Sequence, residues 1–398
     1  MEKQTKVLDW VLRILSYVLV AVVTAVATLA VAVPRQGTIV ADGNADKLDE
    51  LEAIIDYYFI GEADPAYMED MAANAMVEAI GDRWSYYVPA ADMQAFNESK
   101  NNAYVGIGIT IQVREDGTGF DILQVEPGGS AKEAGVLPGD LLVQVEGQDV
   151  APLGVNGAKT LIQGDVGTTV KIAVLRDGEK LEFTLTRRQI QQQVASGQLL
   201  RGNVGYIRIY NFNARCAQET IALIEDLQAQ GATSLLFDVR FNPGGYKDEL
   251  VDLLDYLLPK GCSLFRSEDY LGRVSEDTSD ARCLDMPMGV LMNADSYSAA
   301  EFFAAALWEY EYAFTAGQAT TGKGYFQTTI ALSDGSAVNL SIGKYYTPKG
   351  VSLAEVGGLV PDVPVEVDDE TAAKIYSETL PLEEDPQIQA AIDKLLGK

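Results

Sequence analysis

The sequence predicts an α/β multidomain protein built from an N-terminal transmembrane helix, a small helical region, a compact β domain and a larger α/β core with a mainly parallel sheet. Three patterns predict it. Residues 14–33 form one uncharged apolar run. Residues 103–188 alternate short apolar segments with Gly, Pro and Asp turns, which indicates β structure. Beyond residue 190 strand and helix patterns alternate, which is typical of parallel strands joined by crossover helices.

The apolar run near the N-terminus is about as long as a helix that crosses the hydrocarbon core of a membrane. Three basic residues precede it and one follows it closely, so we expect the N-terminus in the cytoplasm and the rest of the chain outside, in a single-pass protein of the cell membrane. A cleaved signal peptide is the alternative, because Ala30, Val31 and Ala32 resemble a small-x-small cleavage site. The expected parts are a cytoplasmic tail (1–13), a transmembrane helix (14–33) and a linker (34–44).

Residues 45–100 predict the small helical region, since apolar residues recur there at helical spacing. Helices are expected at residues 45–61, 65–80 and 90–97. The β domain follows at residues 101–189, where apolar or alternating runs are separated by turn residues. Its expected strands are residues 105–113, 121–125, 141–145, 171–176 and 181–186, and its expected short helices are residues 131–134 and 157–163.

The α/β core is expected at residues 190–370, where strand and helix patterns begin to alternate. A C-terminal helical segment, residues 371–398, follows it. The expected strands are residues 205–209, 234–239, 288–292, 312–315 and 326–332, and the expected helices are residues 217–230, 246–257, 299–308 and 385–396.

The composition excludes several kinds of chemistry. The chain has no histidine, so Ser-His-Asp and Cys-His proteases, zinc hydrolases with paired histidines and haem proteins with a proximal histidine are excluded. Any acid–base step must use Lys, Tyr, Cys or a carboxylate. The net charge of −28 makes nucleic acid an unfavourable partner. We expect no cofactor and no metal. Cys262 and Cys283 flank an expected hairpin and could form a disulfide outside the cytoplasm, which would leave Cys216 as a buried thiol.

Two strand-to-helix junctions in the core are candidates for a reaction site. The run Asn242-Pro243-Gly244-Gly245 can leave backbone N–H groups free to bind an anion, and an ordinary tight turn is the alternative. Ser298 begins an expected helix, where the helix dipole and the Ala299 N–H would stabilise an oxyanion. Because Glu301 follows three residues later, Ser298 also fits a capping box.

A third junction is Gly322-Lys323-Gly324. A lysine between glycines is commonly a solvated turn residue, and with Gly317 this segment nearly matches a phosphate-binding loop. That match fails because Gly324 stands where Ser or Thr should bind magnesium, and because a strand is expected to follow. Without histidine, a neutral lysine amine can still activate the Ser298 hydroxyl, provided that burial lowers the lysine pKa from roughly 10.4 towards 7.

In this order, the three junctions resemble those of the carboxyl-terminal processing peptidases, also called tail-specific proteases. The resemblance covers about residues 45–396 and implies a protease core of the ClpP/crotonase-like type with Ser298 and Lys323 as a catalytic dyad. The 25-residue spacing of that pair selects Ser298 over Ser296.

The same resemblance implies roles for residues around the dyad. Gln327 would orient the lysine, and Gly244 or Gly245, together with Ala299, would supply the N–H groups of an oxyanion hole. Two residues depart from the family pattern, Gly322 where an aromatic residue is usual and Phe326 where a small aliphatic residue is usual.

The β domain resembles a PDZ domain in its first strand and in a later Gly-, Ala- and Pro-containing run. The resemblance implies that a nest of backbone N–H groups holds the carboxylate of a peptide C-terminus while the peptide adds a strand, and that this module gates the active site. A small β domain used only for packing is the alternative. The expected substrate-binding residues are Tyr104, Val105, Gly106, Ile107, Gly108 and Ile109, with Ile107 and Ile109 lining the pocket.

These observations predict a membrane-anchored, extracytoplasmic serine endopeptidase that recognises unstructured protein C-termini. The alternative is a catalytically silent, membrane-tethered scaffold that only binds peptides, and a nucleotide-dependent enzyme is a more distant third. The expected partners are peptide C-termini, a membrane through residues 14–33, and a second copy of the chain in a homodimer.

Overall fold

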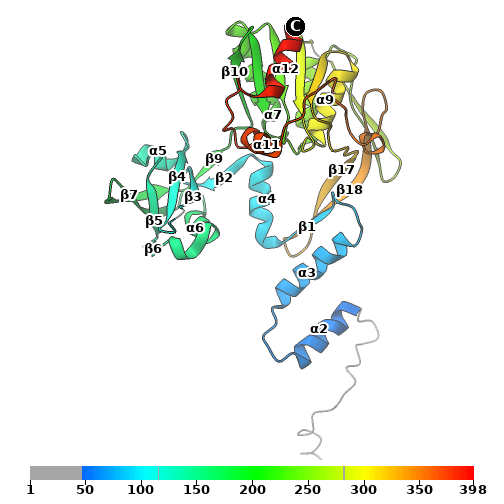
Figure 1. Cartoon of the computed structure of the whole chain (residues 1–398). Helices are drawn as coiled ribbons and strands as arrows, with labels where there is room; N and C mark the ends of the chain where they lie inside the picture. The colour runs from blue at the N-terminus through cyan, green and yellow to red at the C-terminus, as the bar shows by residue number, and fades with distance from the viewer. Residues whose placement is uncertain (1–46, 115, 281–282) are drawn as a thin grey trace, which may run out of the picture. The chain divides into compact units, whose positions relative to one another are not determined.

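The computed structural model describes residues 47–114, 116–280 and 283–398. The chain divides into two compact units, residues 1–76 and 77–398. In the first unit, helix α2 (Lys47–Tyr58) and most of helix α3 (Pro65–Glu78) form where the apolar spacing predicted them (Figure 1). Most of their apolar side chains are nevertheless accessible, since α2 buries none of its residues and α3 buries only Val77.

The fold class predicted from the sequence is wrong in one part, the N-terminal transmembrane helix. Among the residues that the structure describes, no helix has both the length and the apolar character needed to span a bilayer. The reason is length, because α3 and α7 (Cys216–Ala229) have 14 residues each, whereas a span needs about 20 apolar residues. The expected span itself, residues 14–33, lies outside the described residues, and the cell-membrane location that depends on it stays a prediction.

The β domain contains an antiparallel sheet in the order β3-β4-β5-β7-β8, with β6 beside β5. Aliphatic side chains and Phe120 form its core, to which helices α5 and α6 contribute. Strands β2 and β9 form a separate antiparallel pair. The bounds are β2 (Ala103–Gly106), β3 (Ile109–Val113), β4 (Phe120–Val125), α5 (Ser130–Ala134), β5 (Leu141–Val145), β6 (Gln148–Asp149), η2 (Ala151–Leu153), α6 (Gly154–Ile162), β7 (Thr169–Arg176), β8 (Glu179–Thr186) and β9 (Arg188–Gln191).

The single strand expected at residues 105–113 is two strands, because the backbone turns at Ile107 and Gly108. Gly108 has a φ of 81°, and a Cβ atom there would lie 2.7 Å from the Cα atom of Gly129, so only glycine fits. Ile107 is 1% exposed and belongs to the core of the domain. The turn therefore lets β2 pair with β9 while β3 pairs with β4.

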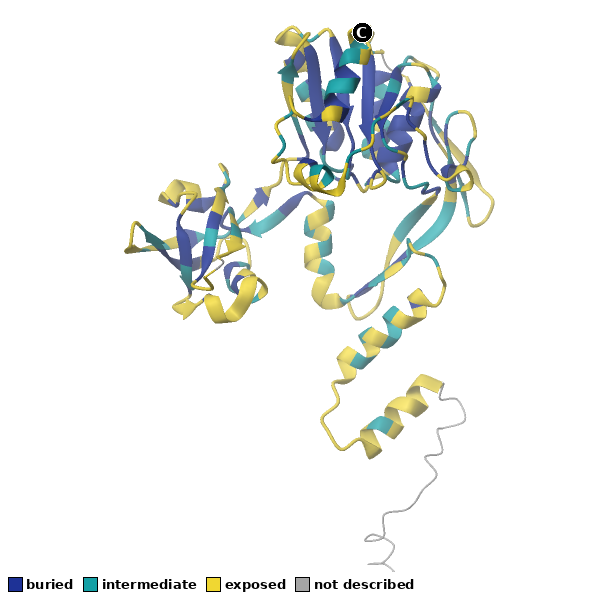
Figure 2. Ribbon diagram, in the orientation of Figure 1, coloured by how far each residue is buried: buried dark blue, intermediate teal, exposed yellow. Residues whose placement is uncertain are grey.

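The α/β core is a six-stranded sheet in the order β10-β11-β12-β15-β16-β19, parallel except for β10. Helices α7, α8 and α9 pack on Ile207, Phe237 and Val290, and helix α12 packs on Tyr206 and Leu291 of the opposite face. Figure 2 shows buried residues concentrated in these strands. The bounds are β10 (Ala195–Leu200), β11 (Val204–Ile209), β12 (Ser234–Asp238), α8 (Lys247–Leu257), β15 (Met288–Met292), α9 (Ala299–Glu309), β16 (Ala313–Gly317), β19 (Val363–Pro364) and α12 (Pro386–Leu395).

A second, antiparallel sheet has the order β1-β18-β13-β14, with β17 beside β18. It joins a segment from before the β domain to the core, since Tyr86 of β1 lies opposite Asn339 of β18. The hairpin expected between Cys262 and Cys283 is β13–β14, and all three cysteines of the chain are free thiols. The bounds are β1 (Tyr86–Val88), η1 (Ala90–Asp92), α4 (Met93–Lys100), β13 (Ser263–Asp269), β14 (Val274–Thr278), β17 (Tyr325–Ala331), β18 (Ala337–Tyr346), α10 (Leu353–Val356) and α11 (Asp369–Tyr376).

Candidate active site

Ser298 occupies the sharp turn between β15 and α9. Its φ of 57° and ψ of −124° are uncommon for a residue with a side chain, so the turn holds Ser298 in a strained conformation. Ser296, two residues earlier, is fully buried and donates its hydroxyl to the carbonyl oxygen of Val239 at 2.7 Å. The Ser296 hydroxyl is therefore used to fix the turn. Ser298 is half-buried and makes no side-chain capping bond, so the capping box considered as an alternative does not form.

The glycine turn at residues 242–245 packs directly against Ser298. Gly244 has a φ of 85°, and a Cβ atom at this position would lie 2.7 Å from the Cβ atom of Ser298. Asn242 fixes the turn, because its Oδ1 accepts the N–H of Gly244 at 2.8 Å and its Nδ2 donates to the carbonyl oxygen of Ile209 at 2.7 Å. Glycine is thus required here by both backbone conformation and close contact.

The N–H groups near Ser298 differ in availability. The N–H of Gly244 is already bonded to Asn242. Within the described part of the chain, the N–H groups of Gly245 and Ala299 have no hydrogen-bond partner. Ala299 is the next residue after Ser298 in α9, and Gly245 follows Gly244, which packs on Ser298. An oxyanion formed at Ser298 would therefore find its donors in Gly245 and Ala299 and not in Gly244.

Lys323 is almost buried, with 8% of its surface exposed, and its Nζ atom lies 4.6 Å from the centre of the Trp84 ring. Burial, and next the positive charge of Lys100, lower the pKa of Lys323 to about 8. Arg83 acts in the same direction, whereas the carboxylate of Asp82 raises the pKa. The pKa of Lys323 thus moves in the direction that a general base requires.

Glu301 holds the loop that carries Lys323. Its carboxylate accepts the backbone N–H groups of Gly322 at 2.7 Å and Lys323 at 2.9 Å, together with the hydroxyl of Thr320. Burial raises the pKa of Glu301, although these hydrogen bonds lower it. Because Glu301 lies one turn after Ser298 on α9, these bonds attach the lysine loop to the helix that the serine begins.

The two side chains of the expected dyad are not hydrogen-bonded to each other. In residues 47–114, 116–280 and 283–398, no hydrogen bond joins the Ser298 hydroxyl to the Lys323 amine. The Ser298 hydroxyl instead lies near Tyr345. Burial raises the pKa of Tyr345, and hydrogen bonding with Ser298 acts in the opposite direction. Tyr345 donates its own hydroxyl to the carbonyl oxygen of Lys323. Gln327 donates to a backbone oxygen at 3.1 Å and to Ser341 at 3.0 Å, and not to Lys323.

Two aromatic residues at this site were missed by the sequence analysis. Trp84 precedes β1 and its ring lies 5.4 Å from that of Tyr297, beside Ser298. Tyr345 lies in β18 and is buried against Phe265 and Phe302. Neither belongs to the three junctions that carry the dyad and the glycine turn. The pairing of β1 with β18 brings Trp84 to the site, and such long-range pairing has no local sequence signal.

A hollow of about 450 Å³ lies at the turn that carries Ser298, since Tyr297 lines it. Pro243 and Tyr297, the neighbours of Gly244 and Ser298, form part of its wall. Phe241 and Tyr376, whose rings are 5.4 Å apart, form another part, and Asp295 adds an exposed carboxylate.

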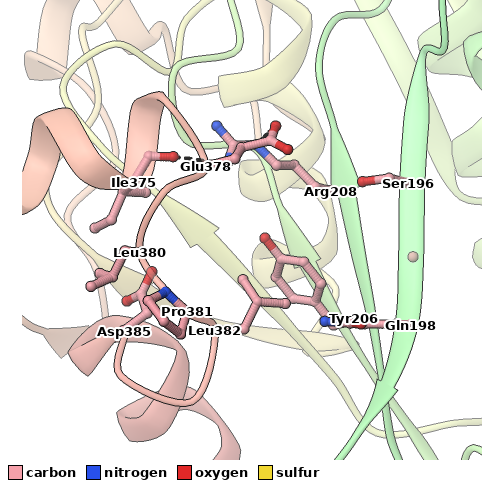
Figure 3. Close-up of a pocket in the computed structure, with 11 residues that line it drawn as sticks. Ser196, Gln198, Tyr206, Arg208, Ile375, Glu378, Leu380, Pro381, Leu382 and Asp385 are labelled. Atoms are coloured by element: carbon pink, nitrogen blue, oxygen red, sulfur yellow. Dashed lines mark hydrogen bonds and ion pairs between the residues drawn. The ribbon is translucent and has the colours of Figure 1, made fainter. Parts of the chain in front are cut away.

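A second cavity, of about 370 Å³, lies between β10, β11 and the segment after α11 (Figure 3). Arg208 donates to the carbonyl oxygen of Ile375 at 3.0 Å and lies 3.7 Å from the carboxylate of Glu378. Tyr206 donates its hydroxyl to Asp238 at 2.8 Å. The charged and phenolic side chains that line this cavity are therefore already bonded to other groups of the protein. We interpret them as a network that stabilises the fold and not as a reaction centre.

A buried ion pair continues this network. Arg240 lies 2.5 Å from Asp238 and 2.9 Å from Asp385. Burial by itself raises the pKa of Asp238, but the Arg240 guanidinium holds it below its ordinary value. The network joins β12 to the start of α12. Among the described residues, no group of three or more Cys, Asp and Glu side chains is placed to hold a metal ion.

The residues expected to bind a peptide are spread over two strands and a turn. Tyr104, Val105 and Gly106 lie in β2 and face β9. Ile107 is buried in the domain core, so its side chain is not free to line a pocket. Gly108 forms the turn, and Ile109 begins β3 and packs against the same core. Helix α6 lies beside β3, which is an edge strand of its sheet.

Two family models match the chain. The model of peptidase family S41 matches residues 203–365, and that of the PDZ domain matches residues 122–176. The first match contains the glycine turn, Ser298 and Lys323, and the second contains most of β4, together with β5 and α6 of the β domain.

Curated relatives are processing proteases. The chain is 31% identical over 334 residues to the carboxy-terminal processing protease CtpA of Bacillus subtilis, which covers 82% of this chain and 70% of the relative. It is 31% identical over 298 residues to the carboxyl-terminal-processing protease of Synechocystis sp., which covers 73% of this chain and 68% of the relative. The crystal structure of a Bacteroides fragilis protein assigned to the S41 proteases has a similar fold, with a TM-score of 0.53, 18% identity, and 85% of this chain and 92% of that one covered.

Proposed function

Because this chain belongs to peptidase family S41, that of the carboxyl-terminal processing serine proteases, we propose that it hydrolyses peptide bonds with Ser298 as nucleophile and Lys323 as general base. A PDZ domain precedes the peptidase core. The family alone does not assign the residues, so the dyad rests on the site itself. Ser298 is held in a strained turn, Lys323 is almost buried, and Glu301 attaches the loop of one to the helix of the other.

The observation that carries the proposal is the lowered pKa of Lys323. At pH 7.5, an amine with a pKa of about 8 is neutral in roughly a quarter of the molecules, whereas an ordinary lysine amine is neutral in roughly one molecule in a thousand. Only the neutral amine can accept a proton. Burial therefore increases the population of competent base by more than two orders of magnitude, without any histidine.

The proposed reaction has two steps. The neutral Lys323 amine accepts the proton of the Ser298 hydroxyl as its oxygen bonds to the carbonyl carbon, and the N–H groups of Gly245 and Ala299 bind the resulting oxyanion. When the C–N bond breaks, the Lys323 ammonium returns its proton to the departing amine. Water then attacks the acyl-enzyme with Lys323 again as base, which releases the carboxylate and restores Ser298.

We propose unstructured polypeptide C-termini as substrates. A PDZ domain binds a C-terminus by adding it as a strand, and β3 is an edge strand with α6 beside it, which supports this mode of binding. An unstructured chain can reach both that edge and Ser298, because it has no tertiary contacts to lose. Gln327 now donates to the carbonyl oxygen of Tyr325 and to Ser341. To orient the Lys323 amine when the dyad forms, its side chain would turn from these partners towards Lys323.

We also propose a homodimer formed through the first unit of the chain. Leu51, Tyr58 and Ile60 are at least half exposed, and Ile60 is fully so. Apolar side chains on one helical region, exposed in this number, are typical of a surface covered by a partner. Sedimentation of the full chain should give the mass of a dimer, and Leu51→Glu should give a monomer. A monomer in both cases would rule out this interface.

A catalytically silent peptide-binding scaffold remains the second candidate, favoured by the absence of a hydrogen bond between Ser298 and Lys323 within the described residues. The full chain incubated with casein separates the two. We expect degradation by the wild type and a loss of at least a thousand-fold in Ser298→Ala and in Lys323→Ala. The control is Lys260→Ala, an exposed lysine of the same core. Degradation that persists in either dyad variant would refute the assignment.

A further inference from the structure

The turn before β1 is fastened to the peptidase core. The carboxylate of Asp82 accepts the hydroxyl of Ser85 at 2.6 Å and the backbone N–H of Trp84 at 3.1 Å. The same Ser85 hydroxyl accepts the N–H of Ser341 in β18 at 3.0 Å. These bonds give the Trp84 backbone a fixed place, and the pairing of β1 with β18 continues it. Trp84 is thus held beside the active site by hydrogen bonds and strand pairing that do not involve Lys323.

The Trp84 ring lies between three groups of the site. The Lys323 amine is 4.6 Å from the ring centre, the Arg83 guanidinium is 4.2 Å from it, and the Tyr297 ring is 5.4 Å away. Both cations are within the range in which a ring face attracts positive charge. The Lys323 amine also lies 5.9 Å from the Tyr297 ring. No other ring-to-cation contact in the described chain involves an amine of the expected dyad.

The attraction between an aromatic face and lysine depends on the proton. The ring quadrupole attracts the ammonium and has no comparable attraction for the neutral amine. The charged groups facing Lys323 come from three elements: Asp82 and Arg83 from the turn before β1, Lys100 from α4 and Glu301 from α9. The neutral phenols Tyr297 and Tyr345 lie beside them. Lys100 and Arg83 disfavour the ammonium, Asp82 and Glu301 favour it, and the ring face, which lies against the amine, adds an attraction of its own.

We propose that Trp84 is a positioning residue that binds the protonated form of Lys323 away from Ser298 and releases the amine when it loses its proton. The proposal rests on Lys323 being the general base. The structure has the Lys323 amine 4.6 Å from the centre of the ring and the Ser298 hydroxyl near Tyr345, which is the arrangement that we assign to the protonated state. In the neutral state the attraction to the ring is gone and the amine is free to reach Ser298. Loss of one proton therefore both creates the base and permits the dyad to form.

The pH dependence of kcat/KM tests this directly. In Trp84→Leu, an apolar side chain still covers Lys323 but no longer stabilises its ammonium. We expect the rising limb of the profile to shift to lower pH by about half a pH unit or more, so that kcat/KM at pH 6.5 increases about three-fold or more. The plateau at high pH should stay within about two-fold of the wild-type value. Trp84→Phe keeps a ring face and should return most of the shift. Trp308→Leu, a matched change elsewhere in the core, should leave the profile unchanged.

A rising limb that stays in place or moves up in a folded Trp84→Leu enzyme would overturn the proposal, as would equal shifts in the Leu and Phe variants. Should Trp84→Leu not fold, replacement of tryptophan by 5-fluorotryptophan keeps the shape of the ring and weakens its attraction for cations. The limb should then move down in the wild type and not in Trp84→Phe. A limb that does not move in the fluorinated wild type would again overturn the role of the ring.

A second measurement does not need catalysis. In the inactive Ser298→Ala background, the pKa of the Lys323 amine can be followed by NMR with labelled lysine, the Lys323→Met spectrum giving the assignment. Replacing Trp84 by Leu should lower this pKa. If it does not, the role of Trp84 is wrong even where Ser298 and Lys323 act as proposed. If it does, while casein is degraded equally by Ser298→Ala and the wild type, Trp84 acts on Lys323 but the assignment of Ser298 as nucleophile is wrong.

Discussion

The carboxylate of Glu301 accepts a 2.9 Å hydrogen bond from the backbone N–H of Lys323, and so attaches the loop of the proposed base to the helix of the proposed nucleophile. Both residues are buried. The contact fixes the backbone of Lys323 but not its amine, which points to Trp84. The site thus combines a rigid main-chain link with a side chain whose position can change.

Glu301→Gln should reduce activity more than it reduces stability. A carboxylate accepts the N–H groups of Gly322 and Lys323 together, whereas a glutamine amide must turn an N–H group towards one of them. We expect a loss of about 1–3 kcal/mol in the free energy of unfolding, from one unmade buried hydrogen bond, and a fall of at least ten-fold in kcat. Urea unfolding and casein cleavage measure the two effects.

The matched control is Glu309→Gln, at the other end of the same helix. Glu309 is also buried and accepts the hydroxyl of Thr347 at 2.6 Å and the N–H of Lys349 at 2.7 Å. We expect a similar loss of stability with activity retained. Equal losses of activity in the two variants would mean that Glu301 acts only through general stability.

Gly244→Ala should abolish activity. The added methyl group would lie 2.7 Å from the Cβ atom of Ser298, and the φ of 85° at Gly244 is unfavourable for alanine, so the serine must move. Gly231→Ala separates the two causes, because Gly231 has a φ of 99° but no neighbour within 4 Å of the added Cβ atom. It should lose about 1 kcal/mol of stability and keep its activity. An active Gly244→Ala enzyme would contradict the packing described at the turn.

The rate of peptide cleavage should rise with pH between about 6 and 9, with a midpoint near the Lys323 pKa of about 8. The base is the neutral amine, whose fraction increases as the pH passes the pKa. The measurement is kcat/KM for a short peptide across this range, with circular dichroism to show that the fold is unchanged. A rate that falls over the range in a folded enzyme would exclude a lysine base.

Lys323→Met should stabilise the protein at neutral pH while it inactivates it. The pKa of Lys323 is lower in the folded state than in the unfolded state, so the unfolded chain binds more protons between about pH 8 and 10.5, and stability rises with pH over this window. Below it, the full cost of a buried ammonium remains, at most about 3 kcal/mol. We expect Lys323→Met to unfold at higher urea concentration than the wild type at pH 7, with the difference shrinking at pH 10. If the difference in urea midpoint is the same at pH 7 and pH 10, the added stability of Lys323→Met comes from packing of the methionine alone.

Asp295 should influence which peptides are cut. Its carboxylate is exposed at the rim of the hollow at the turn that carries Ser298, where it favours a basic side chain near the scissile bond. Asp295→Asn should lower the kcat/KM ratio of lysine- to glutamate-containing peptides several-fold, in keeping with about 1 kcal/mol for an exposed pair. The effect should weaken at high salt. Asp226→Asn, an exposed acid on α7, serves as the control, and an equal change in both variants would point to net charge alone.

Much of the site could be predicted from the sequence because its parts lie at three strand-to-helix or strand-to-loop junctions, each with local signals. The strained Ser298 turn, the glycine turn at Gly244 and the glycine-flanked Lys323 are of this kind. The partner of Glu301 could not be predicted, because a glutamate three residues into a helix can bond its own helix start or a distant loop, and here the loop of Lys323 is closer. The spacing of Ser298 and Glu301 indicated a capping bond within α9, whereas Glu301 bonds the backbone of Gly322 and Lys323.

Other features depend on contacts between distant segments. The split of the first β segment at Ile107 and Gly108 follows from the close approach of Gly129, which is 21 residues later. The position of Trp84 follows from the pairing of Tyr86 with Asn339. Neither contact leaves a periodic pattern in the sequence. The transmembrane helix expected from the apolar run at residues 14–33 is no part of the described fold.

The pairing of β1 with β18 makes the PDZ domain an insertion. The chain contributes Trp84, β1 and α4 to the peptidase, leaves it to build the PDZ domain, and returns to complete the rest. A fragment that begins at residue 190 would therefore present the open edge of β18 to solvent and would lack the tryptophan beside its lysine. Severing the peptidase from its PDZ domain is better done by replacing the inserted residues with a short linker, which keeps both ends of the catalytic body on one chain.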